Sequence, residues 1–180
     1  MLMEGAMKSM STPSVILSHR ELLVAATLGL QRQLECQKNS RSGTNSNLSY
    51  ENKYNAVGPG GLWNNSIEGA LGEFALAKFL GLYPSGIECW NATDVGEHYE
   101  VRTRPKEFQE LFLKKNDKKD KYYVLLQGSF GEYNIRGWVS AVEAFKHREW
   151  FHNNNGKTSF NYWIPHSNLH PMSTLPKVAP

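Results

Sequence analysis

Acidic and basic side chains alternate in a short segment that begins at Asp94. A second acid, Glu100, follows after a turn, and a cation, Arg102, comes two residues later. Side chains two positions apart on a strand share a face, so we expect Glu100 and Arg102 to project together and Val101 to face the other way. Two carboxylates and a cation at one point would suit a divalent metal ion and a phosphate. The alternative is an exposed strand whose charges form a solvated salt bridge.

Another acid lies upstream in residues 63–82, a segment that the pattern predicts to be a helix. Ser66 or Asn65 is expected to cap this helix and Gly81 to end it. Apolar residues lie nearly all round it, which is typical of a buried helix. None of the helical neighbours of Glu73 can pair with a carboxylate. Its charge therefore requires a compensator from outside the helix, which could be a metal ion, an arginine or a proton.

Two further titratable residues near these segments have simpler interpretations. Glu68 lies near the expected helix start, where an acid favours the helix dipole, so we interpret it as structural. By strand alternation His98 shares a face with Glu100 and Arg102 and could act near the site. The ordinary alternative is a surface histidine.

Together these segments resemble the PD-(D/E)XK, or restriction-endonuclease-like, nuclease superfamily. The run Gly69-x-x-Gly72-Glu73-x-x-x-Ala77-x-x-Leu80 is similar to the first core helix of that fold with its active-site glutamate. Asp94 would match the superfamily's aspartate, and Glu100-Val101-Arg102 its (D/E)-x-K strand. With the later Gly137-Trp138-Val139 strand, the order of motifs resembles small nuclease-like proteins encoded by bacteriophages. The resemblance covers roughly residues 62–170.

The resemblance implies a metal-dependent deoxyribonuclease whose cofactor is Mg²⁺ or Mn²⁺. Asp94 and Glu100 would hold the metal, with the Val101 carbonyl as a third ligand. Glu73 would hold the same metal or a second one, or orient a water. Arg102 stands where the superfamily has lysine; it can bind the phosphate and stabilise its charge, but it cannot act as a base. This departure favours the alternative of a catalytically inactive module of the same fold that binds DNA or a protein partner.

Basic side chains follow the strand that carries Glu100. Residues 114–121 contain five lysines with two aspartates among them. Such a run is either a solvated loop or a loop that faces phosphates beside the site. The net charge of +3 does not by itself indicate a nucleic-acid partner. If DNA is the partner, the expected contacts are Arg104, Lys106, Lys114, Lys115, Lys118 and Lys119.

Length and composition indicate a single α/β or α+β domain in which helices flank a central mixed β-sheet, as in the restriction-endonuclease-like core. Residues 1–17 are expected to form a flexible N-terminus, 18–170 the domain, and 171–180 a loose C-terminal tail. The expected elements are a helix over 18–37, a long loop over 38–61, the helix at 63–82, strands at 111–114, 122–127 and 133–139, a helix or short helix and turn at 141–151, and a strand at 160–164.

Local signals support the first helix and the central strand. Ser18 and Glu21 have the spacing of a capping box. Leucine and alanine residues at helical spacing predict the packed face of that helix, namely Leu22, Leu23, Ala26, Leu30 and Leu34. The continuous apolar run at 122–127 predicts a strand buried on both faces.

The cysteines and the N-terminus indicate the compartment. Cys36 and Cys89 are the only cysteines and lack metal-ligand spacing, which suits a reducing compartment. We find no long apolar run for a membrane span and no signal peptide. We therefore expect a cytoplasmic protein, in the host cytoplasm if phage-encoded, with a homodimer left open.

Overall fold

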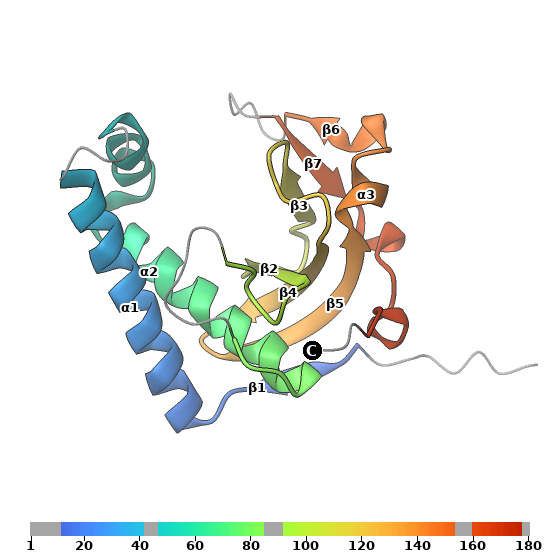
Figure 1. The fold of residues 1–180 in the computed structure, drawn as a ribbon, viewed down its shortest axis with the longest axis horizontal. Helices are drawn as coiled ribbons and strands as arrows, with labels where there is room; N and C mark the ends of the chain where they lie inside the picture. The colour runs from blue at the N-terminus through green and yellow to red at the C-terminus, as the bar shows by residue number, and fades with distance from the viewer. Residues whose placement is uncertain (1–11, 42–46, 85–91, 154–159, 178–180) are drawn as a thin grey trace, which may run out of the picture.

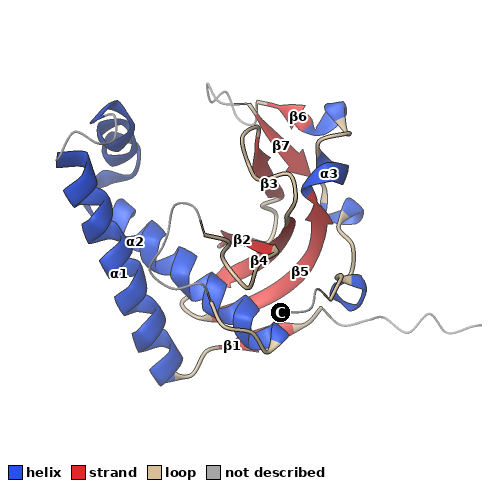
Figure 2. Ribbon diagram, in the orientation of Figure 1, coloured by secondary structure: helices blue, strands red, loops and turns tan. Residues whose placement is uncertain are grey.

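Two long helices lie on one side of a layered β structure. In this computed structural model, α1 (His19–Arg41) packs on α2 (Asn47–Leu80), and α2 covers one face of a four-stranded sheet (Figures 1 and 2). A three-stranded sheet lies on the far side. None of the described helices combines the length and apolarity needed to span a bilayer. The structure describes residues 12–41, 47–84, 92–153 and 160–177.

The four-stranded sheet has the order β1-β5-β4-β2. Its strands are β1 (Ser14–Ile16), β2 (Tyr99–Arg104), β4 (Tyr122–Ser129) and β5 (Glu132–Ser140). β2 and β4 run parallel and the other pairs antiparallel, which confirms a mixed sheet in an α/β domain. The apolar run of β4 explains its interior place. Alternate side chains enter the two hydrophobic cores, with Val124 toward α2 and Leu125 toward the second sheet.

The second sheet is small and has the order β3-β7-β6. It consists of β3 (Leu111–Lys114), β6 (Phe151–His152) and β7 (Asn161–Ile164). The chain passes from β2 through β3 before it enters β4, and this crossover lets β2 and β4 lie parallel. Residues 141–151 were expected to form either one helix or a short helix followed by a turn, and the structure shows the second arrangement. These residues form α3 (Ala141–Ala144) and then a 3-10 turn, η1 (Arg148–Trp150).

The expected start of α1 is confirmed, but its expected packed face is only partly right: Leu22 packs against the main core, whereas Leu23, Leu30 and Leu34 are exposed. The Ser18 N–H donates to Glu21 Oε2 at 2.6 Å, and the Glu21 N–H donates to Ser18 Oγ at 3.4 Å, as a capping box requires.

The face that packs is the one that carries Ala25, Gly29 and Gln33, while Leu23, Leu30 and Leu34 are exposed. A Cβ atom at Gly29 would lie 2.6 Å from Ile67 Cα, so the two helix backbones touch there. Because the two backbones approach so closely, the face with small residues packs against α2 and these leucines remain exposed.

The predicted long loop over 38–61 is wrong. α1 extends to Arg41 and α2 begins at Asn47, with residues 42–46 outside the described part. The Gly58–Gly61 stretch, at the end of that predicted loop, lies inside α2. A helix embedded in longer helical flanks can absorb about 1 kcal/mol per glycine and about 3 kcal/mol per proline. The first turns of α2 also lie beside the end of α1 (Figure 1).

The expected end of α2 is confirmed and its expected cap is not. Gly81 adopts φ +68°, and the Leu82 N–H donates to the Ala77 carbonyl at 2.9 Å, which closes the helix. Asn65 and Ser66 lie well inside the helix instead of at its start, because α2 begins upstream. The Ser66 hydroxyl donates to Gln33 Oε1 of α1 at 2.9 Å.

Both terminal segments are more ordered than expected where the structure describes them. Ser14–Ile16 pairs with β5, so the flexible N-terminus cannot extend to residue 17. Near the C-terminus, Leu175 is buried in the main core, and Tyr99 Oη donates to the Pro176 carbonyl at 2.7 Å. Residues 1–11 and 178–180 lie outside the described part.

Candidate active site and adjoining cleft

Asp94 is held at the edge of β2 by a tight hairpin. Gly96 adopts φ +55°, and Val95 and Tyr99 pair across the turn. β2 is the last strand of its sheet, and the Val101 N–H donates to Asp94 Oδ2 at 2.7 Å. The short spacing seen in the sequence is thus a hairpin, and it fixes one oxygen of Asp94 against the backbone of the strand that carries Glu100.

β2 shows the expected alternation of side chains. Val101 and Thr103 face α2, since a Cβ atom at Gly72 would lie 3.4 Å from Val101 Cγ1 and 2.1 Å from Thr103 Oγ1. Glu100 and Arg102 therefore project from the opposite face, toward the β3–β4 loop. Helix α2 lies on one face of β2 and this loop on the other, so Tyr99, Glu100 and Val101 are buried, while Arg102, Thr103 and Arg104 are half-buried.

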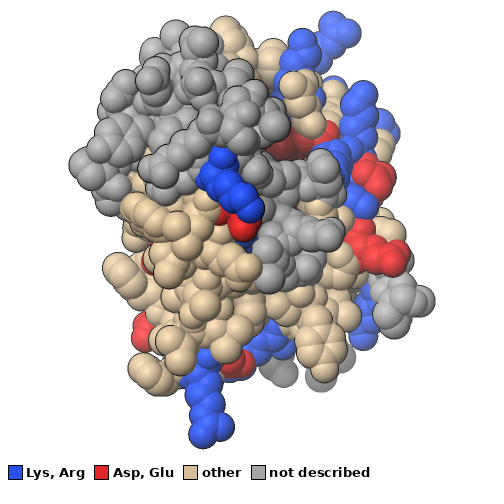
Figure 3. All heavy atoms as spheres, turned by 60° about the vertical axis from the view of Figure 1, so that its left-hand side comes forward, with Lys and Arg blue, Asp and Glu red and all other residues tan. Residues whose placement is uncertain are grey.

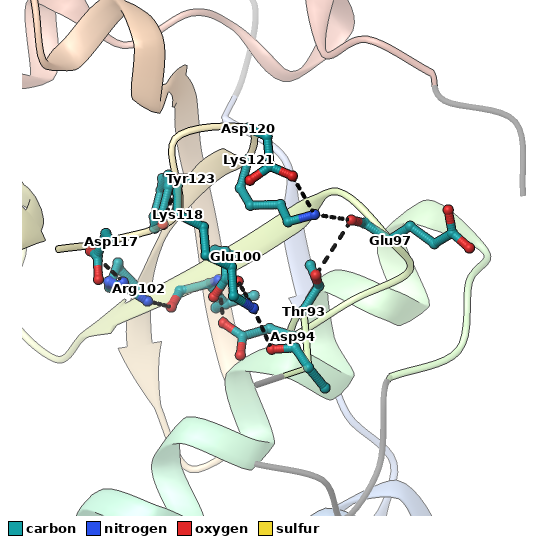
Figure 4. A network of polar contacts seen from close by, with 12 residues as sticks. Thr93, Asp94, Glu97, Glu100, Arg102, Asp117, Lys118, Asp120, Lys121 and Tyr123 are labelled. Carbon is teal, nitrogen blue, oxygen red and sulfur yellow. Dashed lines mark hydrogen bonds and ion pairs between the residues drawn. The ribbon is translucent and has the colours of Figure 1, made fainter. Parts of the chain in front are cut away.

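Glu100 is buried and meets a lysine that the sequence did not pair with it. Its exposed fraction is 8%, and Lys118 Nζ from the β3–β4 loop lies 3.3 Å from Glu100 Oε1 (Figure 4). Lys118 also donates to the Ala92 carbonyl at 2.9 Å. Burial first, and then the negative charge of Asp94, raise the pKa of Glu100 to about 7. Asp94 and Glu100 therefore lie within electrostatic reach of one another.

Glu73 is compensated by an arginine, one of the three possibilities that the sequence left open. Arg32 of α1 forms a two-pronged ion pair with it, with nitrogen–oxygen distances of 2.5 and 2.7 Å. Burial raises the pKa of Glu73 to about 7, and Asp94 adds to the rise while Arg32 opposes it. Because Asp94 acts on both glutamates, Glu73, Asp94 and Glu100 make one electrostatic unit, which we call the acidic cluster.

Arg102 is already neutralised by a neighbouring acid. Its Nη2 donates to Asp117 Oδ2 at 2.7 Å and its Nη1 to the Val101 carbonyl at 3.1 Å, while the guanidinium lies 5.0 Å from the Tyr123 ring centroid. Burial acts to lower the pKa of Arg102, but Asp117 outweighs it and the pKa is raised. Arg102 is therefore a fixed positive charge that exchanges no proton near neutral pH.

The donors around Asp94 fit a hard divalent cation. In the described ranges, no three His, Cys, Asp or Glu side chains lie close enough together to hold an ion alone. Mg²⁺ does not require such a cage, because it keeps several waters and is often bound through one or two carboxylates. Asp94, Glu100 and the Val101 carbonyl supply oxygen donors of this kind. Burial is the main reason that the pKa of Glu100 is raised, and the negative charge of Asp94, which a bound cation would offset, adds to it.

A cleft of about 560 Å³ adjoins the acidic cluster. It runs from the middle of α2 past the end of β2 to the β4–β5 turn. The residues that characterise it are Asn64, Glu73, Arg102, Arg104, Phe112 and Phe130. The cleft reaches the acidic cluster at Glu73, while Asp94 and Glu100 do not line it, and it continues to aromatic and basic side chains.

Arg104 differs from the other basic residues of the site. Its guanidinium lies 5.1 Å from the Phe112 ring centroid and 5.7 Å from that of Trp163. Its Nε is buried and has no hydrogen-bond partner in the described part of the chain. Burial lowers the pKa of Arg104. A desolvated guanidinium held on aromatic rings is prepared to receive an anion.

The other predicted nucleic-acid contacts lie apart from the cleft. Lys106, Lys114, Lys115 and Lys119 are exposed and do not line it, and Lys118 is engaged with Glu100. On the face drawn in Figure 3, charged side chains of both signs gather along the right-hand margin, and smaller groups lie near the centre and at the lower edge. That face therefore shows no uniformly basic surface.

Glu68 is structural, though for a different reason than its sequence position suggested. It lies inside α2 instead of near its start, and its carboxylate accepts hydrogen bonds from the Phe130 N–H and from Tyr133 Oη, the latter at 2.9 Å. His98 lies just before β2, and its ring is 4.0 Å from Glu97 Oε2. Its expected place beside Glu100 is not supported.

Arg32 and Asp117 are the site residues that sequence reasoning missed. Arg32 pairs with Glu73 across 41 positions of sequence, and Asp117 was seen only as a residue that dilutes a lysine run. The usable signal for Arg32 was its place one residue before Gln33, on the side of α1 that also carries Gly29. None of the known protein families, curated proteins or solved structures with which the chain was compared matches it.

Proposed function

We propose that the chain is a metal-dependent nuclease of the restriction-endonuclease-like type, encoded by a bacteriophage and acting on DNA in the host cytoplasm. The observation that carries the proposal is the acidic cluster. A helix, a hairpin and a strand each contribute one acid, and burial, with a further contribution from the charge of Asp94, raises the pKa of both glutamates. Such a cluster beside a cleft that contains two arginines is the arrangement expected for phosphodiester chemistry.

In this proposal the residues divide the work by their chemistry. Asp94, Glu100 and the Val101 carbonyl would hold Mg²⁺ or Mn²⁺, and Glu73 would hold a second ion or orient a water. A bound divalent cation lowers the pKa of an attacking water and neutralises the leaving oxygen. Arg102 lines the cleft and would help to bind the phosphate, with its charge already offset in part by Asp117.

Lys118 supplies the cation that pairs with Glu100. An ammonium group is a compact point charge with three rotatable donors, whereas a guanidinium is a rigid planar fork. Lys118 Nζ lies 3.3 Å from Glu100, so an amine stands at the acidic cluster although the strand itself carries arginine. The lysine lost from the strand motif would thus be supplied by the β3–β4 loop.

The test is cleavage of supercoiled plasmid and of labelled single-stranded and branched DNA in Mg²⁺, Mn²⁺ or EDTA. The wild-type protein should cut only with metal, and Asp94→Ala should abolish cutting because it removes a metal ligand and the anchor of the Val101 N–H. Asp120→Ala is the matched control, since Asp120 is an exposed aspartate of the adjoining loop. Cutting that persists in Asp94→Ala, or in EDTA, would show that the acidic cluster is not the active site.

A non-catalytic binding module is the second candidate, and one observation favours it. Glu73 has Arg32, Glu100 has Lys118 and Asp117 has Arg102, so most of the charge is paired within the protein. Calorimetric titration with Mn²⁺ distinguishes the two. An active site should bind Mn²⁺ and lose it in Asp94→Ala, whereas a binding module has no such requirement and should still shift labelled DNA in EDTA.

A further inference from the structure

The turn between β4 and β5 has an unusual residue at its tip. Ser129 pairs with Glu132, which leaves a two-residue loop, Phe130-Gly131, in which both residues have positive φ, +55° and +85°. Hairpin loops of this kind favour Asn-Gly or Asp-Gly, because a bulky side chain is strained at positive φ. Phe130 is the only residue other than glycine with positive φ in the described part of the chain.

The strained residue also exposes its ring. Phe130 is 76% exposed although it lines the cleft, so its side chain gains little from packing. Its backbone is held instead, because Glu68 of α2 accepts a hydrogen bond from the Phe130 N–H and another from Tyr133 Oη. A rigid turn that presents an apolar ring to water at the rim of a cleft is better explained by a ligand than by stability.

The same end of the cleft holds an anion-binding group. Arg104 pairs with Gln127 in the β2–β4 register, so it lies close to the turn that follows β4. Among the described residues that line the cleft, it is the cation with no ion pair. The cleft's two acids are engaged elsewhere, Glu73 with Arg32 and Glu68 with the turn. An anion beside Arg104 would therefore meet no free carboxylate from these two.

An aromatic ring and a guanidinium that line one cleft can recognise a base and its phosphate. A protruding ring can stack only on a base that is unpaired and unstacked, which duplex DNA does not offer along its length. A cleft of about 560 Å³ has the size of a site for a small ligand, such as one or two nucleotides.

We propose that the cleft binds single-stranded DNA, with Phe130 stacked on a base and Arg104 paired with an adjacent phosphate. The inference rests on the proposed function for the choice of nucleic acid as ligand, and it names single-stranded DNA as the substrate form. It does not require that the acidic cluster cut that strand.

The experiment is fluorescence anisotropy of a labelled oligothymidylate of about 16 nucleotides, and of a labelled duplex of the same length, in EDTA. The single strand should bind more tightly than the duplex. Phe130→Asn should weaken single-strand binding by about tenfold, as loss of one base stack does. Since asparagine suits positive φ, the variant should melt no lower than the wild type. Phe130→Trp should retain the affinity.

Two matched controls test the placement. Phe108 is also 76% exposed but does not line the cleft, so Phe108→Asn should leave the affinity unchanged. Arg104→Gln should weaken binding and reduce the slope of log affinity against log salt by about 0.7, whereas Arg148→Gln, at an exposed position outside the cleft, should not.

Equal effects of the Phe130 and Phe108 substitutions, or duplex binding as tight as single-strand binding, would overturn the inference. Its failure can be distinguished from failure of the proposed function. Single-strand binding through Phe130 without any metal-dependent cutting would refute the nuclease and leave this inference standing. If Asp94→Ala abolishes cutting but Phe130→Asn has no effect on binding, the nuclease proposal stands and this inference is refuted.

Discussion

Two cations beside the acidic cluster have different chemistry, and the geometry assigns them different tasks. Arg102 is committed to Asp117 and to the Val101 carbonyl, which leaves it as a fixed charge. Lys118 donates a hydrogen bond to Glu100 and carries a compact ammonium group with three donors. The strand motif alone pointed to Arg102 as the cation next to the acids, whereas the loop places Lys118 there.

A prediction at the residue scale follows from this difference. Lys118→Met should lower the cleavage rate by about tenfold or more, because it removes the cation that pairs with Glu100 and leaves that buried carboxylate without it. Lys118→Arg should restore only part of the rate, because it returns the charge on a larger, planar group. The measurement is a single-turnover cleavage rate as a function of pH. Lys119→Met, which changes an exposed neighbouring lysine, is the control. If Lys118→Arg cleaves at the wild-type rate, Lys118 contributes only its positive charge.

The acids of the site could be predicted from the sequence, and their partners could not. Glu73 was found because its helical neighbours are apolar, and Glu100 because strand alternation fixed its face. Both signals are local. Arg32 and Lys118 reach the acids from other elements, across 41 and 18 positions, and no local pattern sets such a distance. The sequence therefore identified the need of Glu73 for a compensator but could not choose among a metal, an arginine and a proton.

At the scale of elements, the crossing of α2 over β2 places Glu73 next to the strand. Gly72 makes this crossing close, because a Cβ atom there would lie 2.1 Å from Thr103 Oγ1. Gly69, one turn earlier, has open space where a Cβ atom would be. Packing against β2 therefore requires a glycine at position 72, whereas packing places no such requirement on position 69.

Alanine substitutions at these two positions should have opposite effects. Gly69→Ala should raise the free energy of unfolding by up to about 1 kcal/mol, the helix preference of alanine over glycine. Gly72→Ala should lower it by about 1–3 kcal/mol, because the methyl group pushes α2 away from β2. Urea denaturation of both variants checks this. If Gly72→Ala is as stable as Gly69→Ala, the close crossing does not constrain the fold.

Element prediction succeeded where short-range signals decide and failed where packing does. The capping box at Ser18, the glycine that ends α2 and the apolar run of β4 are local and were predicted. The first half of α2 contains Gly58–Gly61, which favours a loop locally, but the long helix includes it. The exposed leucines of α1 show the same limit, since the contact at Gly29 decides which face is buried. β1 was missed because three residues give no usable period.

Across the whole molecule, the acidic cluster makes the stability depend on pH in an unusual direction. Glu73 and Glu100 have folded-state pKa values raised to about 7, while the ordinary value is 4.5. Between these values the folded state binds more protons than the unfolded state, so the free energy of unfolding falls as pH rises from 4.5 to 7. The pKa of Glu21 is lowered to about 2, chiefly by Lys78, so Glu21 reduces the free energy of unfolding only as the pH falls below 4.5.

Urea denaturation in EDTA from pH 4.5 to 8 should show this fall, at up to about 1.4 kcal/mol for each unit by which a pKa is raised. In Asp94→Asn the fall should be smaller, because the charge of Asp94 contributes to both raised values. Asp120→Asn, at an exposed position, should leave it unchanged. Mg²⁺ should stabilise the protein more at pH 8 than at pH 5, since its carboxylate ligands must be ionised. A stability that is flat from pH 4.5 to 8 would mean that Arg32 and Lys118 already compensate both glutamates, and the electrostatic case for a cation at Asp94 would fail with it.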